Sequence, residues 1–427
     1  MKKLITFLSA VATVAILSGC GGGGGILEDT PPSGTLDENF GGGDGYRVYE
    51  TTNQDRLKDM DIDNNGNIYL LSNRKSGTKW YIMASKVDSS GDVVNSFGSN
   101  GIVLKQLYTN KNSNGNNIKV DGNKVYFTSS GENTSGDTAG ALWCLNGSDG
   151  DKCNSFGVNG KKLFGAINGY TSVGAIEIKN NNLYIAKSYT NSSHHSQTRI
   201  YRLNKADGSF NSSYLMPQDY FVSDIVKEGS NIYSAGTSSS GGNYSASLWK
   251  FTSDLNFNFY KNKDISNIVN NGYHFTGVSS AVADSNGNIY ITGFIRTNST
   301  ATPFDLYVAK FKSNGSLDTT FAINGIFTYN GSHNKNDAGE AIAIDSNGKI
   351  VVAGYTENGS DKDILLIRLN SDGSLDTSFN EDDNSGILVE DLEGDEDVRA
   401  MKIDNNGKIV IAGSLDNRDN FIAKINP

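Results

Sequence analysis

The chain has 427 residues, with 37 basic and 47 acidic side chains and a formal net charge of −10. An acidic balance of this size disfavours nucleic acid and anionic lipid surfaces as partners. Glycine is abundant, proline is scarce, and β-branched residues fill the apolar runs, which together indicate an all-β protein.

Residues 1–20 are predicted to be a signal peptide. Lys2 and Lys3 give it a positive start, the apolar stretch Leu4–Leu17 is too short for a mature membrane span, and Ser18-Gly19-Cys20 follows. This ending resembles the lipobox of bacterial lipoproteins, in which the cysteine is acylated and becomes the new N-terminus. The resemblance implies that a lipid on Cys20 anchors the chain in a membrane. An ordinary secretory signal with a chance cysteine is the alternative.

Residues 21–39 are predicted to be a flexible tether, because they hold Gly21–Gly25 and Pro31-Pro32 and show no apolar periodicity. Many enterobacterial lipoproteins that stay in the inner membrane carry an aspartate directly after the lipidated cysteine. Here that position is Gly21. The resemblance therefore implies an outer membrane lipoprotein, on either the periplasmic or the cell-surface face.

From residue 40 to residue 427 the sequence repeats. A turn rich in Asp, Asn and Gly precedes a short apolar strand, most clearly in Asp284–Gly293, Asp345–Gly354 and Asp404–Gly413. Intervals of about 50 to 60 residues between the copies are typical of repeat architectures. The first aliphatic residue of the strand recurs at Ile68, Val125, Leu183, Ile232, Ile289, Ile350 and Ile409.

A second motif ends on an aromatic residue and recurs once per repeat, as in Ser313–Phe321 and Ser371–Phe379. The number of these motifs equals the number of apolar strands, so we predict seven units. The aromatic residues are Phe40, Phe97, Phe156, Tyr214, Phe259, Phe321 and Phe379.

Each unit offers four short strands, which in the last unit are expected over residues 386–390, 398–403, 408–412 and 420–425. Asn-Gly turns tolerate positive φ and favour tight hairpins. Radial repetition of such antiparallel units predicts a seven-bladed β-propeller. The chain ends after a third strand, so residues 46–50 are expected to complete the last blade and close the ring. An open β-solenoid is the alternative.

Leu375–Phe379, followed by a Gly-Ile pair, and the segment Ala341–Tyr355 carry a family resemblance. They resemble the bacterial delta-60 repeat closely over Phe311–Pro427 and recognisably over Leu36–Gly160, whereas residues 160–259 match it poorly. The resemblance implies propeller blades and no common activity.

Two further cysteines, Cys144 and Cys153, flank a turn-rich segment. In an oxidising envelope this pair is expected to form a disulfide. A metal site is the alternative, but the nearby sequence offers no third or fourth soft ligand.

Acidic residues recur thirteen positions before the first aliphatic residue of the apolar strand. They are Asp55, Asp219, Asp337 and Glu396, with Asp397 beside the last. In a propeller this position is expected near the central channel, where the carboxylates would favour a calcium ion or a basic partner. The alternative is that each acid accepts hydrogen bonds in its own turn.

Four other polar segments carry candidate ligands or charges. Asp61–Ile68 matches the start of a calcium-binding EF-hand loop but has Ser72 where the bidentate glutamate belongs, so a hairpin is favoured. His194-His195 lies in a polar loop that is not expected to bind metal alone. The acidic runs Glu381–Asp383 and Glu390–Asp397 are expected to be a solvated face.

No catalytic motif is present, neither a nucleophile elbow, nor a zinc-protease helix, nor a phosphate-binding glycine loop. The sequence therefore favours a lipid-anchored, non-catalytic module that binds a protein or a glycan, with calcium as a possible cofactor. The alternative is a calcium-dependent envelope hydrolase or lyase with its site at the propeller channel. An assembly factor of the outer-membrane β-barrel machinery is less favoured, because the tryptophan-bearing repeat of that propeller family is absent.

Overall fold

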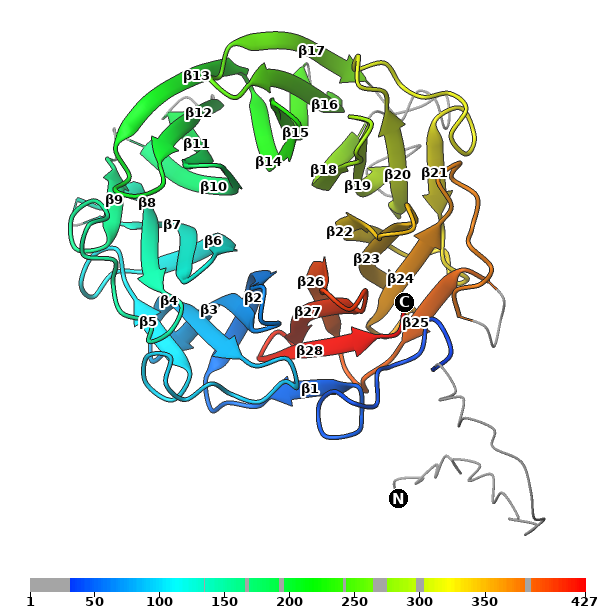
Figure 1. Cartoon of the computed structure of the whole chain (residues 1–427), viewed down its shortest axis with the longest axis horizontal. Helices are drawn as coiled ribbons and strands as arrows, with labels where there is room; N and C mark the ends of the chain where they lie inside the picture. The colour runs from blue at the N-terminus through cyan, green and yellow to red at the C-terminus, as the bar shows by residue number, and fades with distance from the viewer. Residues whose placement is uncertain are drawn as a thin grey trace, which may run out of the picture. The chain divides into compact units, whose positions relative to one another are not determined.

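The structure, a computed structural model, describes residues 31–427 apart from 134, 166–168, 192–195, 241–242, 264–274, 297–302 and 381–384. From Pro32 onward these residues form one compact unit. Its strands make seven four-stranded antiparallel blades around a central channel, which confirms the predicted seven-bladed propeller (Figure 1). The described residues hold no helix with the length and apolar character that a membrane crossing requires. The predicted signal peptide, with Cys20, lies outside them.

Each of the first three blades runs from an inner strand beside the channel to an outer strand at the rim. Blade 1 contains β2 (Gln54–Ile62), β3 (Ile68–Ser76), β4 (Lys79–Val87) and β5 (Ile102–Lys105). Blade 2 contains β6 (Ser113–Asp121), β7 (Lys124–Glu132), β8 (Thr138–Asn146) and β9 (Lys161–Phe164). Blade 3 contains β10 (Gly169–Lys179), β11 (Asn182–Asn191), β12 (Ser196–Asn204) and β13 (Phe210–Gln218).

The next three blades repeat this order. Blade 4 contains β14 (Tyr220–Glu228), β15 (Asn231–Ser240), β16 (Asn243–Thr252) and β17 (Phe257–Lys263). Blade 5 contains β18 (Phe275–Ala283), β19 (Ile289–Arg296), β20 (Asp305–Phe311) and β21 (Ile326–Tyr329). Blade 6 contains β22 (Asp337–Ile344), β23 (Ile350–Glu357), β24 (Lys362–Leu369) and β25 (Ile387–Glu390).

Blade 7 joins the two ends of the chain (Figure 1). It contains β26 (Glu396–Ile403), β27 (Ile409–Leu415), β28 (Asp419–Ile425) and, as its outer strand, β1 (Tyr46–Tyr49). Every residue of β1 pairs with β28, and the two strands are antiparallel. The predicted closure of the ring by the N-terminal strand is therefore confirmed.

The residues just before β1 also pack on blade 7. Leu36 forms a β-bridge with Ile425, and the Gly34 amide donates a hydrogen bond to the Asn426 carbonyl at 3.0 Å. The tether predicted over residues 21–39 is therefore too long at its C-terminal end, because residues from Pro32 belong to the compact unit. Sequence periodicity missed this segment because it pairs with the far end of the chain.

The Asn-Gly turns are the hairpins between the first and second strands of blades. In blade 7, Asp404 Oδ1 accepts hydrogen bonds from the amides of Asn406 (2.8 Å) and Lys408 (3.0 Å). Gly407 has a φ of +80°, which glycine adopts without strain. The EF-hand-like segment Asp61–Ile68 is the same hairpin in blade 1.

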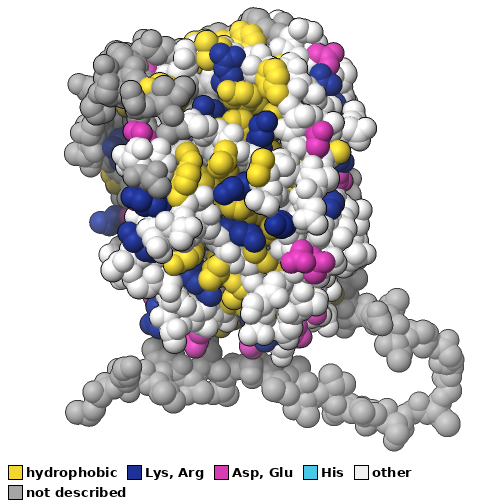
Figure 2. Space-filling view, turned by 90° about the vertical axis from the view of Figure 1, so that its left-hand side faces the viewer, with side chains coloured by type: hydrophobic (Ala, Val, Ile, Leu, Met, Phe, Trp, Pro, Cys, Tyr) yellow, Lys and Arg dark blue, Asp and Glu magenta, His cyan; other side chains and the backbone are white. Residues whose placement is uncertain are grey.

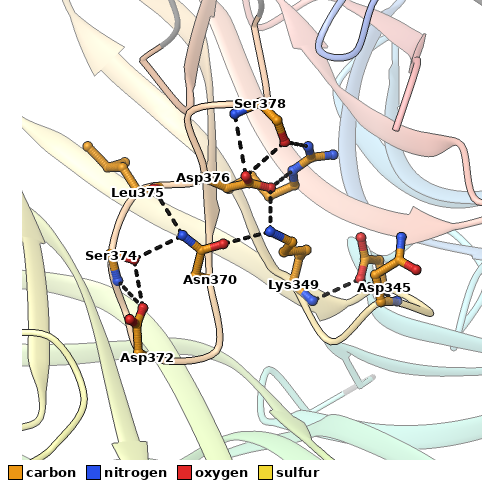
Figure 3. A network of polar contacts seen from close by, with 10 residues as sticks. Asp345, Lys349, Asn370, Asp372, Ser374, Leu375, Asp376 and Ser378 are labelled. Carbon is orange, nitrogen blue, oxygen red and sulfur yellow. Dashed lines mark hydrogen bonds and ion pairs between the residues drawn. The ribbon is translucent and has the colours of Figure 1, made fainter.

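The motif that ends on an aromatic residue is a structural anchor. In blade 6, Phe379 is fully buried, and Asp376 accepts a hydrogen bond from Arg368 at 2.7 Å. Asp376 also pairs with Lys349 at 3.2 Å (Figure 3). Ser378 donates its hydroxyl to the same carboxylate at 2.8 Å. Burial opposes ionisation, but these partners together hold the pKa of Asp376 below its usual value. The two sequence landmarks therefore serve the fold.

Candidate functional site

A ring of buried polar residues lies near the start of the inner strands, at one end of the channel wall. Each member lies opposite the same position of the second strand of its blade, so the seven are equivalent in register. All are 0 to 1% exposed. The ring consists of Asp55, Ser113, Thr171, Tyr220, Thr276, Asp337 and Glu396.

Three of the four acids that the sequence singled out belong to this ring, but each faces a different partner. Asp55 lies opposite Arg74, which donates hydrogen bonds to it from Nε (2.8 Å) and Nη2 (2.5 Å). Asp337 lies opposite Thr356 and accepts a hydrogen bond from the Gly331 amide at 2.8 Å. Asp55 and Asp337 are therefore each engaged within their own blade or loop.

Asp219 does not occupy the ring. The hairpin between β14 and β15 is one residue shorter than the hairpin between β2 and β3. The residue thirteen positions before Ile232 is therefore Asp219, one residue ahead of the ring position. Tyr220 takes the position instead, and its hydroxyl donates to the Ser234 carbonyl at 3.0 Å. Asp219 lies in the preceding turn with a φ of +59°, where its carboxylate accepts a hydrogen bond from the Ser196 amide.

Asp397 faces away from Glu396, as successive residues of a strand do. Arg399 donates two hydrogen bonds to it, at 2.9 Å from Nε and 2.6 Å from Nη2, and Lys362 lies at 3.2 Å. This carboxylate is neutralised by two cations and does not join the predicted cation site.

Glu396 is the exception among the three carboxylates of the ring, because its opposite residue is the apolar Leu415, whereas Asp55 faces Arg74 and Asp337 faces Thr356. The side chain is fully buried, and neither carboxylate oxygen accepts a hydrogen bond of ordinary geometry from the described residues. Burial, followed by the charges of Asp391 and Asp363, raises the pKa of Glu396 to about 8, although the amides of Leu392 and Gly394 offset part of this.

Asp363, Asp391 and Glu396 form a carboxylate cluster in which one oxygen of each residue lies within 4.8 Å of the others. Asp363 comes from β24 of blade 6, Asp391 from the loop between β25 and β26, and Glu396 from β26 of blade 7. Asp363 was not among the predicted site residues, and Asp391 was predicted only as part of the acidic run Glu390–Asp397. A signal existed for Asp363, because Asp305 occupies the same position in β20.

The channel wall is shaped by a shift of register in every inner strand, at the same height in each blade. Such bulges re-aim side chains. The residues at these shifts line a channel cavity of about 600 Å3, and they include Lys58, Asn117, Ser223, Ser279, Glu340 and Arg399.

The charges of the channel are largely paired with one another. Glu177 lies 2.9 Å from Lys227 and 3.6 Å from Lys119, and Arg399 lies 3.5 Å from Glu340. Burial opposes the charge of Lys119, but Glu177 and the other channel acids outweigh this effect and raise its pKa. The wall thus carries both signs and presents no one-sided potential to a ligand.

Two channel acids connect neighbouring blades. Asp59 accepts a hydrogen bond from the Ile118 amide of blade 2 at 2.9 Å, and Asp224 accepts one from the Ala281 amide of blade 5 at 3.0 Å. Burial is the largest cause of their raised pKa values. Because their oxygens accept hydrogen bonds from backbone amides of the next blade, both acids link neighbouring blades.

Cys144 and Cys153 are joined as a disulfide with a Cα–Cα distance of 5.4 Å. The bridge closes the loop after β8, and both residues are buried. Of the remaining residues singled out in the sequence, Cys20, His194, His195 and Glu381–Asp383 lie outside the described part of the chain.

The comparisons with known proteins agree with the fold. The family described as "Domain of unknown function (DUF5122) beta-propeller" matches residues 285–321 and 346–379. Each match runs from an Asn-Gly hairpin to the aromatic end of the second motif. No curated protein matches the chain.

Solved structures with this fold have very different sequences. Drosophila Semaphorin 2a is 8% identical with a TM-score of 0.51, over 90% of this chain and 75% of that chain. YCF48 from Cyanidioschyzon merolae is 10% identical with a TM-score of 0.45, over 90% and 98%. BamB from Moraxella catarrhalis is 11% identical with a TM-score of 0.38, over 86% and 85%. At these identities the likeness concerns the fold alone.

Proposed function

We propose that this chain is a lipid-anchored envelope protein whose propeller is a non-catalytic module that binds an acidic partner protein. The lipobox-like segment ending at Cys20 supports the anchor. The pairing of charges in the channel supports a non-catalytic role. Acids and bases that form ion pairs, or that accept hydrogen bonds from a neighbouring blade, are not poised for proton transfer. The partner is inferred from the outer surface.

The observation that carries the proposal is an exposed apolar face on the outer strands of blades 2 and 3, beside which β9 carries Lys161 and Lys162. Leu163 on β9 is 44% exposed, and Phe210 and Leu215 on β13 are 57% and 43% exposed. Figure 2 shows hydrophobic side chains interleaved with Lys and Arg over this side of the molecule. Exposed apolar groups that are gathered on one face are typical of interaction sites.

The outer strand β13 is also unusual within the repeat. It spans nine residues, whereas β5, β9, β21 and β25 span four each, and it lies at the end of its sheet. A long strand edge offers unpaired backbone groups to a partner strand. This part of the chain is also where the sequence departs most from the repeat.

A basic face on a chain of net charge −10 favours a partner that presents acidic side chains around an apolar centre.

Photo-crosslinking in intact cells tests the binding face. A photoreactive residue at position 213, on β13 between Phe210 and Leu215, should yield one discrete adduct with an acidic protein. Introducing Phe210→Glu and Leu215→Glu should abolish that adduct, and Val389→Glu on the exposed outer strand β25 should not. No adduct, or equal adducts from the three proteins, would refute the assignment of this face.

The anchor is tested separately. Metabolic labelling with a fatty acid should modify the wild-type chain and not Cys20→Ala, and the variant should leave the membrane fraction. Equal membrane association of both proteins would contradict lipidation at Cys20.

A further inference from the structure

We propose that Asp363, Asp391 and Glu396 bind one divalent cation, and that calcium fits the site best. The proposal rests on the geometry of these three carboxylates and is independent of the proposed binding function. It differs from the cation site expected from the sequence, of which it retains Glu396 alone.

Glu396 supplies the first argument, because a fully buried carboxylate whose oxygens accept no hydrogen bond of ordinary geometry from the described residues is costly and calls for a partner. The amides of Leu392 and Gly394 offset only part of this cost. At the equivalent position of blade 1, Arg74 neutralises Asp55. Blade 7 has Leu415 there, which supplies neither charge nor a donor. A cation held by Glu396 would take the place that the guanidinium occupies in blade 1.

The surrounding charges point the same way. The side chains that act most strongly on Glu396 are Asp391 and Asp363, both acids. Among the described residues no lysine or arginine forms an ion pair with any member of the cluster. The neighbouring cation Lys362 is engaged by Asp397, and the imidazole of His333 has a small effect on Asp363.

The ligand set favours calcium over magnesium. Calcium binds oxygen at about 2.3 to 2.6 Å, so two oxygens on one ion lie at most about 5 Å apart, and the separations here are within 4.8 Å. Magnesium demands strict octahedral geometry and usually keeps several waters, so it suits three carboxylates from three separate segments less well. Asp391 is exposed, so water can complete the irregular coordination that calcium accepts.

The ligands are placed to couple two blades. Asp363 belongs to blade 6 and Glu396 to blade 7, while Asp391 lies in the loop that connects them. That loop is already held by hydrogen bonds, since the Glu393 amide donates to Asp391 at 2.7 Å. A bound ion would therefore order the loop against β24 and stabilise the folded state.

The test uses the full-length chain, purified in detergent and freed of metal with EDTA, with calcium chloride as the probe. Calorimetric titration should give one calcium ion per chain, and the melting temperature should rise with calcium and less with magnesium. Glu396→Gln and Asp391→Asn should each weaken calcium binding at least tenfold and abolish the shift in melting temperature. Asp391 is exposed, so its variant tests the site even if Glu396→Gln fails to fold.

Asp305→Asn is the matched control, because Asp305 occupies in β20 the position of Asp363 in β24 and lies near Asp337, and in the described part of the chain no third carboxylate joins this pair. It should bind calcium as the wild type does. Failure of the wild type to bind calcium would overturn the proposal. So would unchanged binding by Asp391→Asn, which would place the ion elsewhere in the chain.

Discussion

Arg74 on β3 donates two hydrogen bonds to the buried carboxylate of Asp55 on β2, the inner strand of the first blade. Removing one partner of a buried ion pair leaves an uncompensated charge, which costs about 3 to 5 kcal/mol. We expect Arg74→Ala to lower the free energy of unfolding by that amount in urea titrations. Arg47→Ala, which breaks the exposed pair with Asp92, should cost less than about 1 kcal/mol. Equal losses from both variants would contradict this.

Deleting the N-terminal strand should destabilise the whole ring. A chain that starts after Glu50 lacks β1 and leaves β28 as an unpaired edge in blade 7. Its melting temperature should fall well below that of a chain that starts at Pro32, which keeps the compact unit intact. Circular dichroism during heating measures both, and coincident melting curves would rule out closure by β1.

Asp305 should make the protein less stable as the pH rises from about 4 to about 6. Burial, followed by the nearby Asp337 charge, raises the pKa of Asp305 from 3.8 to about 6. In this window the folded state binds more protons than the unfolded state, so the free energy of unfolding falls with increasing pH. Asp305→Asn should flatten that part of the pH profile, measured by urea unfolding. An unchanged profile would show that Asp305 has an ordinary pKa.

Asp376 should act with the opposite sign, because its pKa is lowered. Its contribution to stability is present above the unfolded value of 3.8 and is lost as the pH falls through the folded value. Asp376→Ala leaves the buried Arg368 without its counter-ion, so we expect a loss of about 3 to 5 kcal/mol at neutral pH. Asp372→Ala, in the exposed part of the same loop, should cost much less. Equal losses would argue against the network in Figure 3.

The disulfide predicts that Cys144 and Cys153 resist thiol reagents in the folded, unreduced protein. A bridge that closes so short a loop contributes at most about 3 kcal/mol, so reduction should lower the melting temperature without unfolding the chain. Mass spectrometry after alkylation gives the answer. Modification of both thiols before reduction would exclude the bridge.

The sequence by itself determined the number of blades, their four-stranded composition and the closure by the first strand. The reason is that turn chemistry and apolar alternation depend on residues close together in the sequence. Gly407 permits a tight turn, and the aromatic residue Phe379 is buried in the apolar core. The apolar strand recurs in every blade, so its spacing places even the degenerate copies, although Tyr214 lies within β13 and does not repeat the buried aromatic turn.

Which acids meet was decided by the tertiary structure. A hairpin shorter by one residue replaced Asp219 with Tyr220 in the buried ring, and Asp55 found its charge partner across a strand pair in Arg74. Glu396 met Asp363, which lies in a different blade. Contacts between blades depend on strand register and on side chains far apart along the chain, and the spacing of residues within one repeat contains neither.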